Sequence, residues 1–193
     1  MSKYDTPENV CIALTVFITE IREQAAAIRA YDNVFQNTSC ANAFMQRAYD
    51  SIWRELLSEV ARIFDKANTG SSENCSLLRL KELCCKEQYS ILFPNDEKDN
   101  LRQSLDAVFE YYNKLPINYS RRKQLAHHDL KQVIAGECIG ISLEQIEQLI
   151  AIMTDAFIKI YTRVCLGFFE ISFPNYDMLV KRFEDAIKQI VCT

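Results

Sequence analysis

Glycine and proline are both scarce in this chain, whose 193 residues include only 4 of each. Average usage is roughly 7% for Gly and 5% for Pro. An all-β domain needs a turn about every eight to twelve residues, and doubly wound α/β folds place glycines at their phosphate-binding turns. Four glycines cannot serve either architecture. The shortage favours long helices with few breaks, and it excludes a Gly-rich loop that holds phosphate by its backbone amides.

Positive charge and histidine are also in short supply. The chain has 22 Lys and Arg against 26 Asp and Glu, a net charge of −4, and its pI is about 5.3. No overall basic field gathers nucleic acid, so any contact with RNA or DNA needs a local positive patch. With 2 His and no CxxC pair, a zinc cluster is unsupported. We expect no metal and no other cofactor.

Long apolar runs are missing as well, since none approaches the roughly 18 residues of a membrane span. The first apolar run, Val10 to Ile18, lacks the basic start and small-residue exit of a secretory signal. The even number of cysteines would suit a disulfide framework only in a short secreted chain. We therefore expect no membrane contact and a cytoplasmic protein with reduced, mostly buried thiols. The cysteines are Cys11, Cys40, Cys75, Cys84, Cys85, Cys138, Cys165 and Cys192.

What the chain has instead is helical periodicity, because apolar residues recur at steps of three and four along most of its length. A capping-box pair, Ser142 and Gln145, precedes the longest such seam. The predicted helices are Pro7–Tyr31, Ser39–Lys66, Ser76–Lys86, one capped by Asn95 or Asp96 and stopped by Pro116, a long one after Ser142 through Val164, and a final one after Pro174.

Short connections between these helices predict one all-α domain over residues 1–193. We expect an up-and-down bundle of about five to six helices with a long C-terminal helix. Each apolar stripe is interpreted as core, because an amphipathic helix must bury that face. The polar cluster at residues 68–72 is interpreted as a loop that ends the second helix.

One short segment concentrates the residues that could do chemistry. Residues 120–129 are Ser-Arg-Arg-Lys-Gln-Leu-Ala-His-His-Asp and hold three consecutive basic residues, both histidines and a carboxylate. Imidazole both takes and gives a proton near pH 7, and guanidinium is shaped to clamp a phosphate. Together they suffice to cleave RNA through its own 2′-OH without a metal. The imidazole would remove the 2′-OH proton or protonate the leaving oxygen, and the guanidinium would offset charge on the phosphate oxygens.

The bare spacing is a weak motif, because the chain has 11 Arg and a charged run is also typical of a solvated helix face. A carboxylate-bridged metal bundle is the poorer alternative. It needs Glu three residues before a His on each of two helices, whereas Gln124 and Leu125 precede His127 and His128.

The string from Arg121 to Asp129 resembles the R-N-K-x-x-A-H-x-D signature of the HEPN superfamily (higher eukaryotes and prokaryotes nucleotide-binding domains). It is most similar to the branches of phage-defence abortive-infection and toxin–antitoxin systems. The resemblance implies a HEPN-like bundle and a metal-independent endoribonuclease in which Arg121 and His127 are catalytic. Lys123 and Asp129 match the Lys and Asp of the motif and would support catalysis or bind RNA.

Two positions leave alternatives open. Position 122 is Arg where the family typically has a small polar residue, often Asn. Arg122 could add a phosphate contact, or it could mark a copy without activity, that is, a noncatalytic helical module that binds a nucleotide, RNA or a protein partner. His128 is an alternative catalytic imidazole, because it is seven residues from Arg121 and nearly in line with it on a helix.

Helix geometry bears on the oligomeric state. At 100° per residue, Arg121 and His127 point about 120° apart on one continuous helix and could not converge on one phosphate. Either the helix is unwound at Arg121, or a second protomer completes the site. The resemblance implies the latter, a symmetric homodimer with the motif at its cleft. It also implies RNA as substrate and an antitoxin or nucleotidyltransferase as partner protein.

Overall fold

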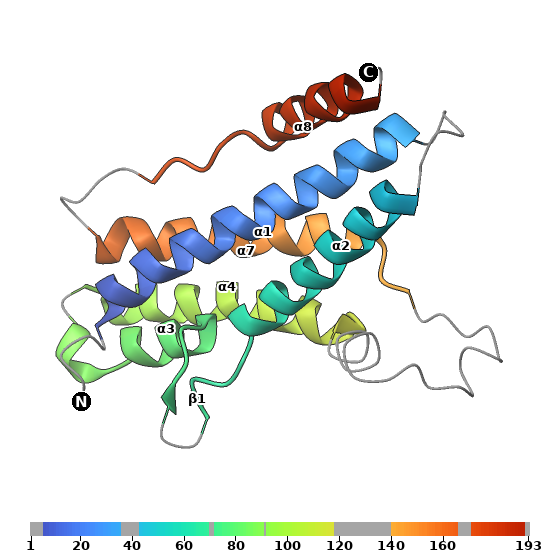
Figure 1. The fold of residues 1–193 in the computed structure, drawn as a ribbon. Coiled ribbons are helices and arrows are strands. Elements are labelled where there is room, and N and C mark those ends of the chain that lie inside the picture. Colours follow the sequence, from blue (N-terminus) through green and yellow to red (C-terminus); the bar gives the residue numbers. More distant parts are fainter. Residues whose placement is uncertain are drawn as a thin grey trace, which may run out of the picture.

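The computed structural model is a bundle of α-helices with one short β-hairpin (Figure 1). It describes residues 6–35, 43–69, 72–90, 92–117, 140–165 and 171–191. The predicted all-α, up-and-down bundle is confirmed. The elements in these ranges are α1 (Pro7–Phe35), α2 (Ala43–Ile63), β1 (Asn68–Thr69), β2 (Ser72–Glu73), α3 (Leu77–Cys84), the 3-10 helix η1 (Glu87–Tyr89), α4 (Asn95–Lys114), α7 (Leu143–Val164) and α8 (Tyr176–Val191).

Helix α1 begins where predicted and runs four residues further. Pro7 occupies the first helical position, where its missing N–H costs nothing. The Thr6 hydroxyl accepts a hydrogen bond from a first-turn N–H at 3.3 Å. The helix passes the predicted end at Tyr31 because the Tyr31 ring packs 4.4 Å from the Phe35 ring and 4.6 Å from the Tyr49 ring of α2. These tertiary contacts extend the helix where the local sequence carries no signal.

Helix α7 confirms the prediction in detail. The Ser142 hydroxyl accepts a hydrogen bond from the Gln145 N–H at 3.3 Å, and the Gln145 side chain accepts one from the Ser142 N–H at 2.9 Å. This reciprocal pair satisfies two N–H groups that a helix start otherwise leaves open. The helix then continues from Leu143 to Val164, as its apolar seam predicts.

The start of α4 differs from the prediction, whereas its end agrees. Asn95 is the first helical residue, and Pro94 rather than Asn95 or Asp96 holds the N-cap position, with no side-chain hydrogen bond. The Pro94 carbonyl accepts the first helical hydrogen bond at 2.9 Å. At the other end Leu115 is extended, with φ −87° and ψ 142°. That conformation is the one a residue before proline adopts, so Pro116 ends the helix as predicted.

The polar stretch after α2 is more ordered than the predicted loop. Strands β1 and β2 pair antiparallel, with Asn68 opposite Glu73 and Thr69 opposite Ser72. The Asn74 side-chain amide donates hydrogen bonds of 2.7 Å to the Thr69 hydroxyl and to the Lys66 carbonyl, which lies between α2 and β1. A side chain that bonds the backbone in this way supports a turn where the sequence alone indicates only polarity.

Helix α1 is the centre of the bundle and contacts α2, α3, α7 and α8 (Figure 1). Helix α8 runs parallel to α1: Arg22 donates to the Pro174 carbonyl at 2.8 Å, and further along Asn33 donates to Glu184 at 2.9 Å. Ala26 and Ala30 of α1 pack against α8 in a small cluster separate from the main core. The two small alanine side chains form a narrow apolar surface on α1, and α8 packs against this surface.

Helices α4 and α7 are antiparallel neighbours. Arg163 near the end of α7 donates to Glu97 near the start of α4 at 2.7 Å. Tyr111 near the end of α4 donates to Gln148 near the start of α7 at 2.8 Å. The main core runs between α1, α2, α4 and α7, and Phe157 is among its largest fully buried side chains.

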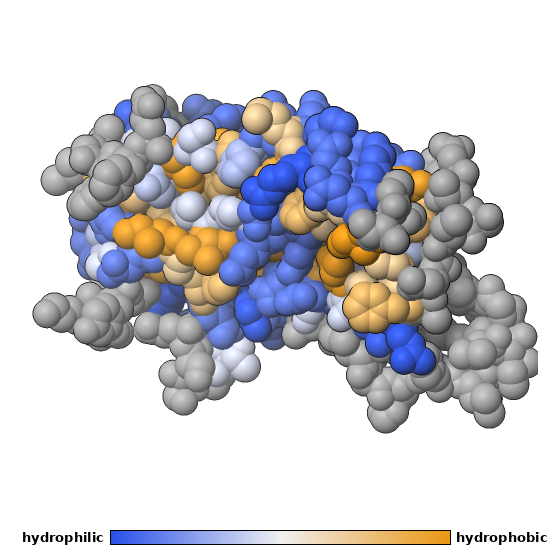
Figure 2. Space-filling model, turned by 45° about the horizontal axis from the view of Figure 1, so that its top comes forward, coloured by the Kyte–Doolittle hydropathy of each residue, from blue (hydrophilic) through white to orange (hydrophobic). Residues whose placement is uncertain are grey.

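The described surface mixes polar and apolar side chains. Figure 2 shows hydrophobic patches on one face that are separated by a hydrophilic band. The large exposed apolar side chains lie on α1, α2 and α8: Ile12, Val16, Phe44, Met178 and Ile190. In the ranges the structure describes, no helix is long and apolar enough to cross a membrane.

The five cysteines that the structure describes are free thiols. Cys11, Cys84 and Cys165 are buried, and Cys75 and Cys85 are half-buried. Burial raises the pKa of the Cys84 thiol to about 12 and the pKa of the Cys11 thiol further still. These buried thiols are therefore neutral and act as small apolar core residues.

Candidate functional site

The segment from Arg121 to Asp129, called the basic segment below, holds six candidate residues that lie outside the described residues, in the stretch 118–139. They are Arg121, Arg122, Lys123, His127, His128 and Asp129. The described residues that flank this stretch are Ile117, after α4, and Gly140, before α7. The described residues nearest to the segment in sequence are therefore those at the end of α4 and the start of α7.

Both ends of the stretch are anchored in the main core. Ile117 is 0% exposed and Ile141 is 8% exposed, and the two belong to the same apolar cluster. The hydrogen bond from Tyr111 to Gln148 joins the last turns of α4 to the first turns of α7. The described residues on either side of the stretch therefore lie at one end of the bundle, the end where α4 stops and α7 begins (Figure 1).

The same end of the bundle holds a charged network that joins three helices. Arg29 of α1 donates from Nε to Glu147 Oε1 of α7 at 2.9 Å and from Nη2 to Glu147 Oε2, and it reaches Glu144 at 2.9 Å. The Tyr176 hydroxyl of α8 donates to Glu147 at 2.7 Å. The bidentate pair is the strong geometry for guanidinium and carboxylate. This network sets the position of the first two turns of α7, the next described helix after the basic segment.

A second polar pair lies beside this network. Burial raises the pKa of the Asp32 carboxyl, and a hydrogen bond from the Tyr49 hydroxyl opposes that rise. Burial, followed by the nearby Asp32 charge, raises the pKa of Tyr49 to about 12. The neighbouring Tyr31 hydroxyl is buried without a hydrogen-bond partner among the described residues. The tyrosines therefore remain neutral donors at pH 7.

The Arg29 network carries more negative than positive charge, because it holds one guanidinium and two carboxylates. Hydrogen bonds from its own backbone N–H and from Arg29 lower the pKa of Glu144, so this carboxyl is ionised. The carboxylates of Glu144 and Glu147 share the single guanidinium of Arg29. An RNA phosphate is repelled by such a surface unless cations shield it. Only the basic residues of the segment itself, at positions 121–123, are clustered in sequence to do so.

The described residues around the segment differ from it in their side-chain chemistry. Both histidines are at positions 127 and 128, so the described ranges contain no imidazole. Within those ranges, no group of three or more His, Cys, Asp and Glu side chains is placed to hold a metal ion. Sequence reasoning missed the Arg29 network, because Arg29 and Glu147 are 118 positions apart and no local pattern joins them.

We predict that Arg29→Met lowers the free energy of unfolding by about 2 kcal/mol, because the half-buried Glu147 carboxylate loses its charged partner. Urea unfolding of the full chain measures this as a lower midpoint with an unchanged slope. Arg102→Met is the matched control. Arg102 is exposed on α4, with Asp99 3.8 Å away and a hydrogen bond of 3.4 Å to the Cys85 thiol. Its substitution should cost less than about 0.5 kcal/mol, because both contacts are exposed to solvent. Equal losses in both variants would show that the Arg29 network adds no stability.

Comparison with protein families gives one match, to the family model HEPN_AbiU2, described as AbiU2, over residues 13–189. The match covers most of the chain. The chain belongs to the HEPN AbiU2 family. No curated protein and no solved structure matches it.

Membership confirms the HEPN resemblance of the abortive-infection branch. The chain is a HEPN module of an abortive-infection family, and the matched region includes all of the basic segment, residues 121–129. The AbiU2 match covers α1 from its second turn through nearly all of α8. The Arg29 network and the anchors at Ile117 and Ile141 thus lie inside the matched domain.

Proposed function

We propose that this HEPN AbiU2 protein is a metal-independent endoribonuclease of a prokaryotic phage-defence or toxin–antitoxin system. The observation that carries the proposal is the Arg121 to Asp129 string within a domain of an abortive-infection family. It contains every histidine of the chain and its only run of three basic residues. The protein would act in the cytoplasm, with RNA as substrate and an antitoxin or a nucleotidyltransferase as partner.

The proposed reaction uses the 2′-OH of the RNA as nucleophile. The 2′-oxygen attacks the adjacent phosphorus and the 5′-oxygen of the next nucleotide leaves, which yields a 2′,3′-cyclic phosphate and a 5′-hydroxyl. The His127 imidazole removes the 2′-OH proton or protonates the leaving oxygen. Arg121 neutralises the charge that develops on the phosphate oxygens. Arg122 and Lys123 bind neighbouring phosphates, and Asp129 orients a basic side chain.

Two copies of the chain would form each site. On one continuous helix Arg121 and His127 would point about 120° apart, so in the proposed dimer one protomer contributes the guanidinium and its partner contributes the imidazole. A symmetric dimer has two such sites. It also brings two basic segments together, which offsets the carboxylates of the Arg29 network and the net charge of −4.

Mixing two inactive variants tests the shared site. Arg121→Ala and His127→Ala homodimers should each be inactive on single-stranded RNA. After subunit exchange at equal concentrations, about half of the dimers are mixed and each mixed dimer has one intact site, so about one quarter of wild-type activity should return. Native mass spectrometry confirms that mixed dimers form. A mixture that contains mixed dimers and remains inactive would show that one protomer supplies both groups.

A noncatalytic module is the second candidate, and Arg122 at the usual Asn position is the observation that favours it. Such a protein would bind a nucleotide, RNA or a protein partner through its basic segment without cleaving. Wild type and His127→Ala would then be equally inert on RNA. Arg121→Ala or Lys123→Ala would weaken binding, and that pattern separates the two candidates.

A further inference from the structure

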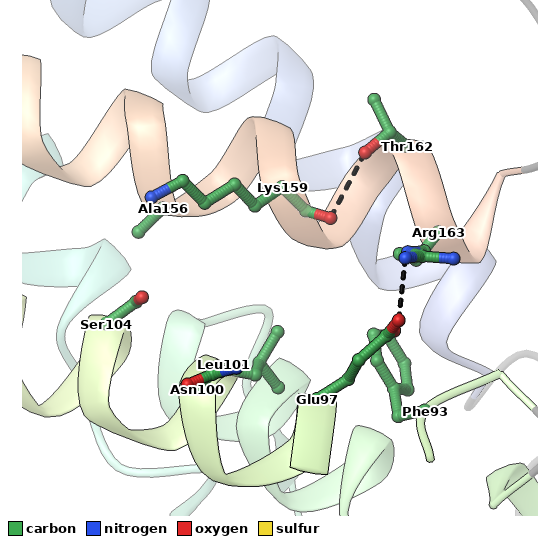
Figure 3. Close-up of a pocket in the computed structure, with 9 residues that line it drawn as sticks. All are labelled: Phe93, Glu97, Asn100, Leu101, Ser104, Ala156, Lys159, Thr162 and Arg163. Atoms are coloured by element: carbon green, nitrogen blue, oxygen red, sulfur yellow. Dashed lines mark hydrogen bonds and ion pairs between the residues drawn. The ribbon is translucent and has the colours of Figure 1, made fainter.

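We propose that a pocket between α4 and α7 binds a small organic anion, with Lys159 as the residue that holds the charged group (Figure 3). The pocket has a volume of about 350 Å³, which is within the usual range for small-molecule sites. Both helices contribute to it. Its lining residues are Phe93, Glu97, Asn100, Leu101, Ser104, Ala156, Lys159, Thr162 and Arg163.

The floor of the pocket is apolar and one end is closed. Phe93, Leu101 and Ala156 are all buried members of the region where α4 packs on α7. The hydrogen-bonded ion pair between Arg163 and Glu97, at 2.7 Å, bridges the two helices at the end of the pocket nearest Phe93 (Figure 3). Because this pair is internally neutral, neither side chain needs a ligand.

The opposite end of the pocket is not neutral. The Lys159 side chain extends along α7 toward Ala156, across from Ser104 of α4 (Figure 3). Lys159 forms no ion pair with any residue in the part of the chain that the structure describes, Asp155 one turn earlier included. The three charged lining residues, Glu97, Lys159 and Arg163, therefore leave one positive charge in excess.

Hydrogen-bonding groups face this charge from α4. Asn100 and Ser104 are one turn apart and so lie on the same face of the helix, toward α7. Neither side chain hydrogen-bonds another residue within the described ranges. An amide and a hydroxyl opposite an ammonium can together hold an oxyanion, while the apolar floor takes an uncharged body. This combination fits a compact organic phosphate or carboxylate.

The pocket lies at the end of α4 and α7 opposite to Ile117 and Gly140, the described residues that flank the basic segment. Glu97 and Arg163 mark the pocket, whereas Tyr111 and Gln148 mark the end where residues 118–139 connect. About ten helical residues separate Ser104 from the end of α4, a distance of about 15 Å. The proposal therefore goes beyond the proposed ribonuclease and does not depend on it.

Isothermal titration of the full chain with 1-naphthyl phosphate tests the proposal. This probe has an apolar body and one phosphate. The wild-type protein should bind it at submillimolar concentration, and Lys159→Gln should weaken binding at least ~10-fold, the effect of about 1.4 kcal/mol. Lys181→Gln is the matched control, because Lys181 is an exposed α8 lysine paired with Asp185. This substitution removes the same positive charge at a position outside the pocket, and it should change the affinity for the probe by less than about 2-fold.

Three further measurements define which kind of ligand the pocket binds. 1-Naphthoate in place of the phosphate distinguishes a carboxylate site from a phosphate site, and either anion bound through Lys159 supports the proposal. Ser104→Phe, which fills the pocket, should abolish binding of whichever of the two anions the wild-type protein binds. Equal binding of uncharged 1-naphthol, equal affinity of Lys159→Gln and wild type, or no binding of either anion would overturn it. Lys159 is exposed, so its substitution leaves the fold intact.

Discussion

Replacing His127 with alanine is expected to lower the rate of RNA cleavage by about 10²–10⁴-fold, the usual contribution of a general acid–base residue. In the proposed reaction the imidazole carries the only proton transfer that the protein performs near pH 7. Alanine removes it without removing Arg121 to Lys123, so RNA should still bind. The measurement is single-turnover cleavage of a labelled single-stranded RNA, with binding followed separately by fluorescence anisotropy.

His128→Ala is the matched control for this substitution, because it deletes the neighbouring imidazole in the same segment. The expected loss is less than about 5-fold, since His128 would contribute only to RNA contacts. If His128→Ala were inactive and His127→Ala active, the catalytic imidazole would be that of His128. Cleavage that survives in the double variant His127→Ala/His128→Ala would rule out an imidazole as the essential group.

The second large effect is on stability. Phe157→Ala is expected to lower the free energy of unfolding by about 3–5 kcal/mol, the range for a fully buried aromatic residue. Phe157 is 0% exposed in the middle of α7, and its ring lies 5.9 Å from the Tyr161 ring and 6.3 Å from the Phe173 ring. Since a domain is stable by only about 5–15 kcal/mol, this cavity would remove much of the total. Urea unfolding monitored by circular dichroism measures it.

Phe44→Ala on α2 is the control with the same chemical change. Phe44 is 75% exposed, so its loss leaves no cavity and should change stability by no more than about 0.5 kcal/mol. A Phe157→Ala protein as stable as Phe44→Ala would mean that α7 does not pack against the core as described.

Helix α7 shows how far local sequence determines structure in this chain. Its capping box and its apolar seam are both local patterns, and the helix follows them from Leu143 to Val164. The break at Pro116 is local too, because proline restricts the residue before it. By contrast, the extension of α1 to Phe35 depends on the Tyr49 ring of another helix. No pattern within α1 indicates where that ring lies.

Local sequence likewise predicts only part of the candidate site. The basic segment is a string of adjacent residues, so the sequence names its candidate catalytic groups, Arg121 and His127, directly. The surroundings of the segment are assembled from distant parts of the chain. The network of Arg29, Glu147 and Tyr176 joins three helices, and the pocket of Lys159 needs α4 and α7 side by side. Only the folded structure brings such residues together.

The central claim is that this HEPN AbiU2 protein cleaves RNA with its own side chains. The most direct test is incubation of the purified wild-type protein with single-stranded RNA in excess EDTA, followed by analysis of the fragment ends. The proposed reaction requires cleavage in EDTA, with 2′,3′-cyclic phosphate and 5′-hydroxyl ends, and none with His127→Ala. RNA that stays intact in EDTA with wild-type protein, whether or not an added divalent metal restores cleavage, would contradict it.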